Sequence, residues 1–236
     1  MTSIENAYNE REKQKSNAYA EEYKRNFLTT EEPFPGIENE YNYFQSFIPT
    51  IKLEEVNALA SKWITKENRV VILTAPEIEG IQIPTEADIR KYLDEAEMAN
   101  VEPYTDKVSD KPLIESEPKP GSIASVRKID PVDTEVWTLS NGAQVIVKST
   151  DFKDDEILFS AYSLGGNSLY GQKDDVSADL APSVLALSGL GDFDKVSLDK
   201  LLSGKAVSIS PYISDLREGF SGGSSVKDVE TLFQLI

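Results

Sequence analysis

The sequence predicts an α+β protein made of two partial domains, the second a mostly antiparallel sheet with helices on one face. Helical patterns dominate the first hundred residues, a proline-rich and charged stretch follows, and strand patterns alternate with short helices after it. The 236 residues suffice for two modest hydrophobic cores. We therefore divide the chain into a first domain at 1–101, a linker at 102–134 and a second domain at 135–236.

Three helices are expected in the first segment, over residues 4–28, 37–48 and 53–63. Apolar side chains recur at helical spacing in each of them. Pro33 should stop the first helix and Pro49 the second, because proline has no backbone N–H to donate. The aromatic side chains of the first two helices are expected in a core, with contact to a bound peptide as the alternative.

The rest of the first segment should hold a strand and a further helix. RVVILT at 69–74 is a short β-branched run, which is typical of a buried strand. A helix should begin after a capping box that starts at Thr85. The helix at 53 begins after Lys52, which cannot accept a hydrogen bond, so we expect Thr50, water or Glu55 to satisfy its first N–H groups.

The second segment should open with a β-hairpin. Its strands, 136–139 and 143–148, flank Asn141 and Gly142, a pair that favours a type I′ turn. This is the strongest short-range hairpin signal in the chain.

Three more strands are expected at 156–163, 207–213 and 217–223. The second of them alternates apolar and polar residues, as a half-buried strand does. It also contains Pro211, which indicates an edge strand or a bulge because proline cannot donate to a central ladder.

Three helices should accompany these strands. The first, at 177–187, contains Pro182, which should kink it or confine its regular part to one side of the proline. The second should be capped by Ser197, and the third should begin with a capping box of Ser225 and Asp228. The apolar stripe of this third helix is still running at the end of the sequence, so we expect the natural chain to continue.

Composition excludes several kinds of chemistry. The chain has no histidine and no cysteine, which removes disulfides, imidazole shuttles, catalytic triads and zinc sites built on those side chains. A net charge of -17 argues against nucleic acid or an anionic membrane as a partner. No apolar run is long enough to span a membrane, and the first residues do not form a signal peptide.

Two acidic clusters could offer oxygen ligands to a hard cation. They are Asp151, Asp154, Asp155 and Glu156, and Asp174 with Asp175. Neither has the spacing of a calcium-binding loop, so a solvated turn is the favoured interpretation. The glycine pairs do not form a phosphate-binding loop. Trp63 and Trp137 are expected to anchor the cores of their segments.

Several phrases recur in a fixed order along the chain. In the first segment they are YKRNF at 23–27, PFPGIE at 33–38, EY at 40–41, LEEVNALASKWI at 53–64 and RVVILTAP at 69–76. In the second they are the run at 137–170, SGLGDF at 188–193, LSGKAVSISPYI at 202–213 and EGFSGGSS at 218–225. Together they resemble the pitrilysin/insulinase family of zinc metallopeptidases, from the end of its second domain to the start of its third.

This resemblance implies a parent protein of four related domains whose two halves close around a peptide. The family's zinc motif, His-x-x-Glu-His, lies in its first domain. The third domain repeats that topology, and the matching stretch here is Leu180 to Val184, which offers no zinc ligand. We therefore expect no catalytic, cofactor-binding or metal-binding residue in this chain, and zinc in the parent protein.

The function implied is that of a non-catalytic segment of a zinc metalloendopeptidase, shaping the chamber and hinge. The alternatives are a structural or interaction subunit of an inactive family member and an unrelated α+β binding module. The partner implied is a peptide substrate, and the compartment is the periplasm, with the cytoplasm as the alternative. Because we expect an unpaired strand and a cut helix, we also expect the chain to form homodimers.

Overall fold

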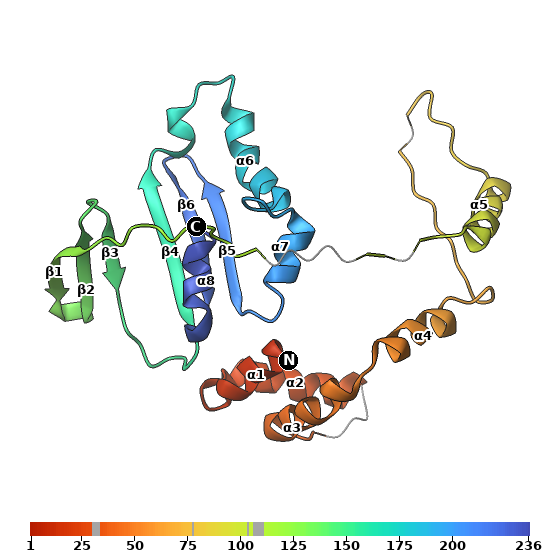
Figure 1. Ribbon diagram of the computed structural model, residues 1–236, viewed down its shortest axis with the longest axis horizontal. Helices are drawn as coiled ribbons and strands as arrows, with labels where there is room; N and C mark the ends of the chain where they lie inside the picture. The colour runs from red at the N-terminus through yellow and green to blue at the C-terminus, as the bar shows by residue number, and fades with distance from the viewer. Residues whose placement is uncertain (30–33, 77, 103, 106–110) are drawn as a thin grey trace. The chain divides into compact units, whose positions relative to one another are not determined.

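A computed structural model describes residues 1–29, 34–76, 78–102, 104–105 and 111–236 (Figure 1). Two compact units can be distinguished in it. One comprises Met1–Pro49 together with Val108–Ile236, and the other comprises Thr50–Lys107. The expected α+β class with antiparallel sheets is confirmed.

The first unit contains a three-stranded antiparallel sheet formed by β4 (Ile157–Leu164), β5 (Val207–Ile213) and β6 (Arg217–Ser224). The strand order is β4-β6-β5, so β6 is central. Pro211 lies on β5, at an edge of the sheet as predicted. All three strands occur within a residue or two of the expected positions.

Glycine in β6 lets its neighbours approach closely. A Cβ atom built on Gly222 would lie 2.1 Å from the Ser208 carbonyl oxygen, and one built on Gly219 would lie 2.0 Å from the Ala161 carbonyl oxygen. Any larger residue would therefore push β6 away from β5 or β4. This requirement accounts for the glycine-rich sequence of the central strand.

Helix α8 (Val229–Gln234) packs on this sheet (Figure 1). Leu232 is fully buried, and the ring of Phe233 meets Phe159 of β4 edge to face, with centroids 5.7 Å apart. The apolar stripe of this helix is therefore covered in part, while Phe233 and Ile236 remain 59% and 49% exposed. The sheet itself already covers its central residue.

The start of this last helix also differs from expectation. A short 3-10 turn, Val226–Asp228, precedes α8, and Ser225 makes no side-chain cap. The Asp228 carboxylate instead accepts hydrogen bonds from the Ala206 N–H at 2.8 Å and from the Ser225 hydroxyl at 2.7 Å. Asp228 therefore bridges to the residue before β5 because a donor from another segment lies within its reach.

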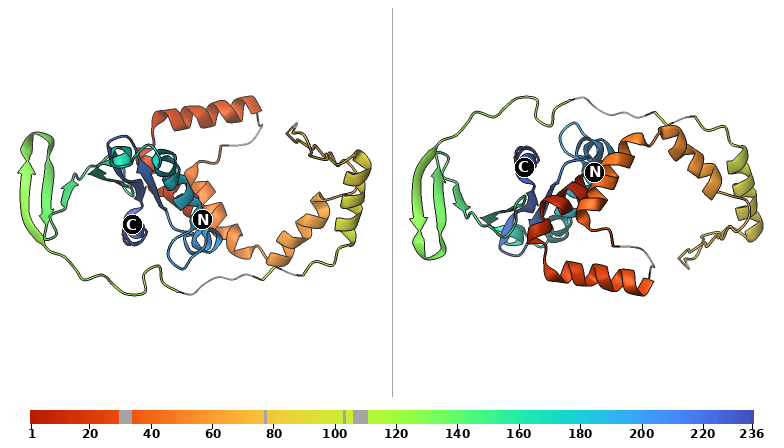
Figure 2. Two further views of the ribbon diagram at one scale, coloured as in Figure 1. Left: turned by 90° about the horizontal axis from the view of Figure 1, so that it is seen from above. Right: turned by 90° about the horizontal axis from the view of Figure 1, so that it is seen from below.

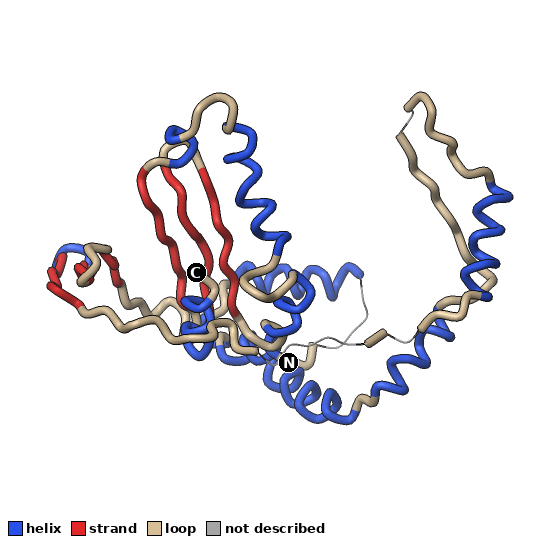
Figure 3. Tube along the Cα trace, turned by 45° about the horizontal axis from the view of Figure 1, so that its top comes forward, coloured by secondary structure: helices blue, strands red, loops and turns tan. Residues whose placement is uncertain are grey.

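Helix α6 (Asp175–Ser188) lies beside β5, and α7 (Lys195–Leu201) follows it (Figure 3). The helix runs continuously through Pro182, so the expected confinement to one side of the proline is wrong. The cap of α7 is Asp194, whose carboxylate accepts from the Ser197 N–H at 2.7 Å. Ser197, which the sequence predicts as the cap, therefore donates this hydrogen bond through its N–H.

A second sheet, separate from the first, consists of β1 (Ile123–Ile129), β2 (Thr134–Leu139) and β3 (Gln144–Val147) in that order (Figure 2). The hairpin of β2 and β3 is confirmed. Strand β1 lies inside the stretch 102–134 that composition assigns to a linker. Its sequence, IASVRKI, has no period-two apolar pattern and contains serine, arginine and lysine, so it was not recognised as a strand. The three-part division of the chain stays a prediction.

The hairpin turn is not the expected type I′. Gly142 has φ +87°, but Asn141 does not have a positive φ. The Gly142 N–H donates to the Leu139 carbonyl at 2.9 Å, and the Leu139 N–H donates to the Ala143 carbonyl at 2.8 Å. This is the longer loop in which a type I turn is followed by a left-handed glycine.

The N-terminal residues form α1 (Thr2–Asn9), a 3-10 turn (Arg11–Lys13), α2 (Ser16–Thr29) and α3 (Ile37–Phe47). The expected single helix over 4–28 is thus divided in two. Tyr8 of α1 stacks on Tyr41 of α3, with ring centroids 4.4 Å apart.

The division of that helix is stabilised by polar contacts at the break. The Arg11 guanidinium donates to the Tyr8 carbonyl, and the Tyr19 hydroxyl donates to the Arg11 carbonyl. The predicted stop at Pro33 lies outside the described residues. Another 3-10 turn, Ile48–Thr50, follows α3.

The second unit contains α4 (Leu53–Trp63) and α5 (Glu86–Met98), both as expected. Glu55 accepts from the Lys52 N–H at 2.8 Å, one of the three solutions foreseen for that helix start. Thr85 and Asp88 form the predicted capping box of α5. Both caps could be predicted from the sequence because each joins residues that are three positions apart.

The expected strand at 69–74 is not formed. Its backbone is irregular, and the side chains of Val70 and Ile72 are 83% and 84% exposed. A strand requires a partner that supplies hydrogen bonds, and the described residues of this unit supply none. Trp63 is also exposed, at 72%, so it does not anchor a core.

The first unit holds the small hydrophobic core of the described chain. Its buried apolar residues are Val136, Ala178, Phe193, Leu232 and Leu235. Trp137 is half-buried and donates its indole N–H to Glu135 at 2.8 Å. Among the described residues, no helix combines the length and apolar character needed to cross a membrane.

Candidate functional site

The stretch expected to correspond to the family's zinc motif, Leu180 to Val184, lies in the middle of α6. Leu180 and Val184 are exposed there, and Ser183 stands between Pro182 and Val184. Aliphatic side chains cannot ligate zinc, and a lone serine hydroxyl is not one of its usual ligands. Within the described part of the chain, no three His, Cys, Asp or Glu side chains gather closely enough to hold a metal ion.

The acidic cluster at 151–156 contacts other parts of the protein. The Asp154 carboxylate pairs with Lys13 at 2.6 Å, and the Asp155 carboxylate accepts from the Val226 N–H at 2.8 Å. Glu10 accepts from the backbone N–H groups of Asp154 and Asp155 at 2.9 and 2.6 Å. Two carboxylates of the cluster are therefore committed to protein donors.

The other acidic pair lies at the start of α6. Asp174 is the residue before the helix and forms no side-chain cap, and Asp175 is the first helical residue. A carboxylate there interacts favourably with the helix dipole. These two residues thus have a structural interpretation that needs no cation.

A buried carboxylate, Asp228, joins the start of β5 to the last helix. Burial by itself raises the pKa of this carboxyl, but the hydrogen bonds from the Ala206 N–H and the Ser225 hydroxyl and the charges of Lys205 and Lys227 outweigh it. The pKa of Asp228 therefore lies below its ordinary value, and the group is ionised at neutral pH. Lys205 also donates to the Thr231 hydroxyl at 2.9 Å.

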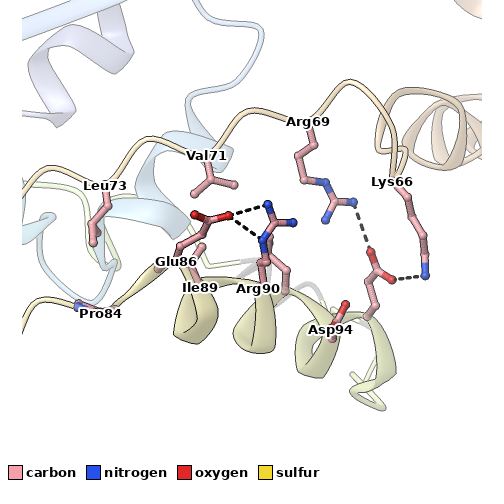
Figure 4. A pocket seen from close by; sticks show the side chains of 11 residues that line it. Lys66, Arg69, Val71, Leu73, Pro84, Glu86, Ile89, Arg90 and Asp94 are labelled. Atoms are coloured by element: carbon pink, nitrogen blue, oxygen red, sulfur yellow. Dashed lines mark hydrogen bonds and ion pairs between the residues drawn. The ribbon is translucent and has the colours of Figure 1, made fainter.

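The second unit has an open groove of about 620 Å³ between residues 66–73 and α5 (Figure 4). Glu97 pairs with Lys66 at 2.8 Å and with Arg69 at 3.4 Å. The hydrogen bond from Lys66 holds the pKa of the Glu97 carboxyl below its usual range. Sequence reasoning missed this arrangement because its partners come from segments about 30 residues apart.

A second ion pair lies along this groove. Glu86 accepts two hydrogen bonds from Arg90, at 3.0 and 2.7 Å, along one face of α5 (Figure 4). Val71, Leu73 and Ile89 supply its apolar lining. The groove therefore has neither a nucleophile beside a base nor an unpaired cluster of charge, and its ion pairs connect the irregular chain to the helix.

An open groove of about 1340 Å³ is lined by residues of the N-terminal helices. Its lining includes the rings of Tyr19, Tyr23, Phe34 and Tyr43. Tyr23 meets Phe34 edge to face, with centroids 5.5 Å apart. These rings are partly exposed, so the expectation that they belong to a core is wrong for the described chain.

Two curated proteins resemble this chain along most of its sequence. One is a zinc protease PQQL-like protein of Arabidopsis thaliana, 30% identical over 190 residues, or 80% of this chain. The other is a probable zinc protease PqqL of Haemophilus influenzae, 25% identical over 208 residues, or 85% of this chain. This chain spans 20% and 22% of their lengths.

Two solved structures share its fold. A ferredoxin protease, FusC, crystallised as a mutant with Arabidopsis ferredoxin, has a TM-score of 0.51 and 20% identity over 94% of this chain. The periplasmic protease PqqL of Escherichia coli has a TM-score of 0.51 and 19% identity over 99% of this chain. The matched parts are 25% and 26% of those chains.

No family model matches the sequence. The similarity nevertheless extends over both segments, as the ordered phrases indicate, and the relatives carry zinc protease names. By sequence and by fold, this chain is therefore related to the zinc proteases of the pitrilysin/insulinase family, of which it matches about a fifth to a quarter of the length.

Proposed function

We propose that this chain is a non-catalytic segment of a zinc metalloendopeptidase that encloses and hydrolyses peptides. The observation that carries this proposal is a contrast. The chain resembles zinc proteases over 80% of its length, yet it contains no histidine and no cysteine. Its part in the reaction is therefore to shape the peptide chamber and hinge.

Zinc does not fit the residues of this chain. A catalytic zinc site needs three protein ligands from histidine, cysteine or carboxylates, held in tetrahedral geometry. The stretch from Leu180 to Val184 supplies none of them, and two carboxylates of the loop at 151–156, Asp154 and Asp155, are engaged with protein donors. The zinc of the intact protein thus belongs to residues outside this chain, and no catalytic step passes through its residues.

Peptides are the proposed substrates, and the periplasm is the proposed compartment. The relatives are named as proteases, and the E. coli protein of the same fold is described as periplasmic. The absence of cysteine is compatible with an oxidising compartment.

The test is hydrolysis of an unstructured fluorogenic peptide by the intact protein that contains this chain. We expect a chelator to abolish hydrolysis and added zinc to restore it. Hydrolysis that persists after the zinc has been removed would contradict the proposal. Peptide binding without hydrolysis would favour the alternative, a structural or interaction subunit of an inactive family member.

A further inference from the structure

The first helix is attached to a distant part of the chain by a set of polar contacts. Glu5 of α1 pairs with Lys227, which precedes α8, at 3.0 Å. The Thr2 hydroxyl donates to the Gly204 carbonyl at 3.0 Å. These partners are more than 200 residues apart in sequence.

Glu10, just after α1, lies at the centre of the contact. One carboxylate oxygen accepts both N–H groups of Asp154 and Asp155, and the other lies 3.4 Å from the Lys153 ammonium. The Glu10 side chain is only 12% exposed. A carboxylate that accepts two backbone N–H groups forms charge-assisted hydrogen bonds, which are about twice as strong as neutral ones.

The charges on the two sides are complementary. Along the N-terminal segment they run negative, negative and positive, at Glu5, Glu10 and Lys13. The facing charges are of opposite sign and come from Lys227, Lys153 and Asp154. The hydrogen bond to Glu5 raises the pKa of Lys227, so this ammonium stays charged over the working range of pH.

The contact is polar and loosely packed. A groove of about 580 Å³ lies beside it, lined by Asn6, Glu10 and the ends of β4, β5 and β6. The amide oxygen of Asn6 is buried there without a hydrogen bond from the protein. No buried apolar residue comes from α1 among the described residues, so charge and hydrogen bonds carry the attachment.

We propose that α1 and the turn after it form a detachable ionic clamp, which holds the segment before residue 50 onto the domain that contains β4, β5 and β6. Because the outer pairs, Glu5 with Lys227 and Lys13 with Asp154, are more exposed and screened by salt, and Glu10 is held by polar contacts alone, the clamp opens without unfolding either part. Glu10 supplies most of its strength, and the outer pairs fix its register. The clamp is independent of any peptidase activity of the intact protein.

Cysteine cross-linking in the whole 236-residue chain tests this clamp. The natural sequence has no cysteine, so Thr2→Cys with Ser203→Cys gives a background-free pair next to Gly204. A short bismaleimide should join them within one molecule, seen as a shift in gel mobility. We expect the rate to fall about two- to fivefold in 1 M salt, where charges are screened beyond about 3 Å.

Charge variants then separate the contributions. Glu10→Gln should slow the cross-link about tenfold, since hydrogen bonds to a charged group are the stronger contacts. Glu5→Lys should slow it about two- to fivefold, and adding Lys227→Glu should restore it. The matched control, Glu86→Gln, breaks an ion pair confined to α5 and should leave the rate unchanged.

Three results would overturn the clamp: no cross-link at low salt, a cross-link insensitive to Glu10→Gln, or a swap that fails to restore the rate. Circular dichroism of every variant checks that the helices and sheets remain folded. A variant that loses the cross-link together with its circular dichroism signal would also count against the clamp, because opening is proposed to occur without unfolding.

Discussion

The sheet of β4, β5 and β6 and the unit Thr50–Lys107 show how differently similar sequence patterns behave. Both contain amphipathic helices and β-branched runs. In the sheet region, α8 packs against β5 and β6, and its Leu232 is fully buried. In Thr50–Lys107 the helices and the run at 69–74 meet few partners, and no described residue there is buried. A pattern specifies an element, but burial requires the surface that completes it.

The largest expected difference between the two regions concerns leucine truncation. Leu232→Ala removes a fully buried side chain and should lower the free energy of unfolding by about 3 kcal/mol. Leu53→Ala in α4 removes a side chain that is 70% exposed and should change it by less than about 0.5 kcal/mol. Urea denaturation followed by circular dichroism measures both. Equal effects would mean that α4 is as well packed as α8.

The next effect concerns backbone approach in the sheet. Gly222→Ala should destabilise the sheet region by about 2 kcal/mol, because the new methyl group would meet the Ser208 carbonyl. Gly171→Ala is the matched control, since a Cβ atom there meets nothing within 4 Å. The same denaturation experiment measures both variants. If Gly222→Ala leaves the free energy of unfolding unchanged, β5 can move away from the new methyl group at little cost.

A smaller effect is expected from the buried carboxylate Asp228. Asp228→Asn weakens the bonds from the Ala206 N–H and the Ser225 hydroxyl and should cost about 1 to 2 kcal/mol at pH 7. The pKa of this carboxyl is lowered in the folded state, so its stabilisation is present above its ordinary pKa of 3.8 and is lost as pH falls below that value.

The pH dependence provides an independent check on Asp228. Unfolding followed from pH 7 to pH 2 should show the wild-type protein losing its advantage over Asp228→Asn below about pH 4. If the difference in free energy of unfolding between the two proteins stays constant across this range, the ionised form of the Asp228 carboxyl does not stabilise the fold.

The smallest effect concerns self-association through the second unit. Val70 and Ile72 are exposed on a segment that has strand sequence without a partner, so we expect homodimers at micromolar or higher concentration, favoured by added salt. Ile72→Lys should weaken the dimer, while Leu187→Lys, at an exposed position of α6, should not. Sedimentation equilibrium over a concentration series measures this, and a 26.2 kDa monomer throughout would contradict it.

Local signals in the sequence predicted local structure well. The capping box at Thr85, the hairpin around Gly142 and the edge position of Pro211 each depend on a few neighbouring residues. The antiparallel sheets followed from period-two patterns. Composition also predicts that this chain holds no zinc site, because a chain without histidine or cysteine lacks the commonest ligands, and that stays a prediction.

Features that depend on distant partners could not be predicted. The run at 69–74 has the composition of a buried strand, but a strand forms only where another supplies its hydrogen bonds. The bridge from Asp228 to Ala206 and the contacts of Glu10 join segments that no short motif relates. Strand β1 was missed because its lysine, arginine and serine residues resemble a linker.

The most direct test of the account is the zinc content of the purified 236-residue chain after dialysis, beside that of the intact protein. The account predicts zinc in the intact protein and far less than about one zinc per chain here, because the stretch from Leu180 to Val184 has no ligand to offer. Elemental analysis that finds about one tightly held zinc per chain would contradict it, since some set of carboxylates would then form a site that this structure does not contain in its described residues.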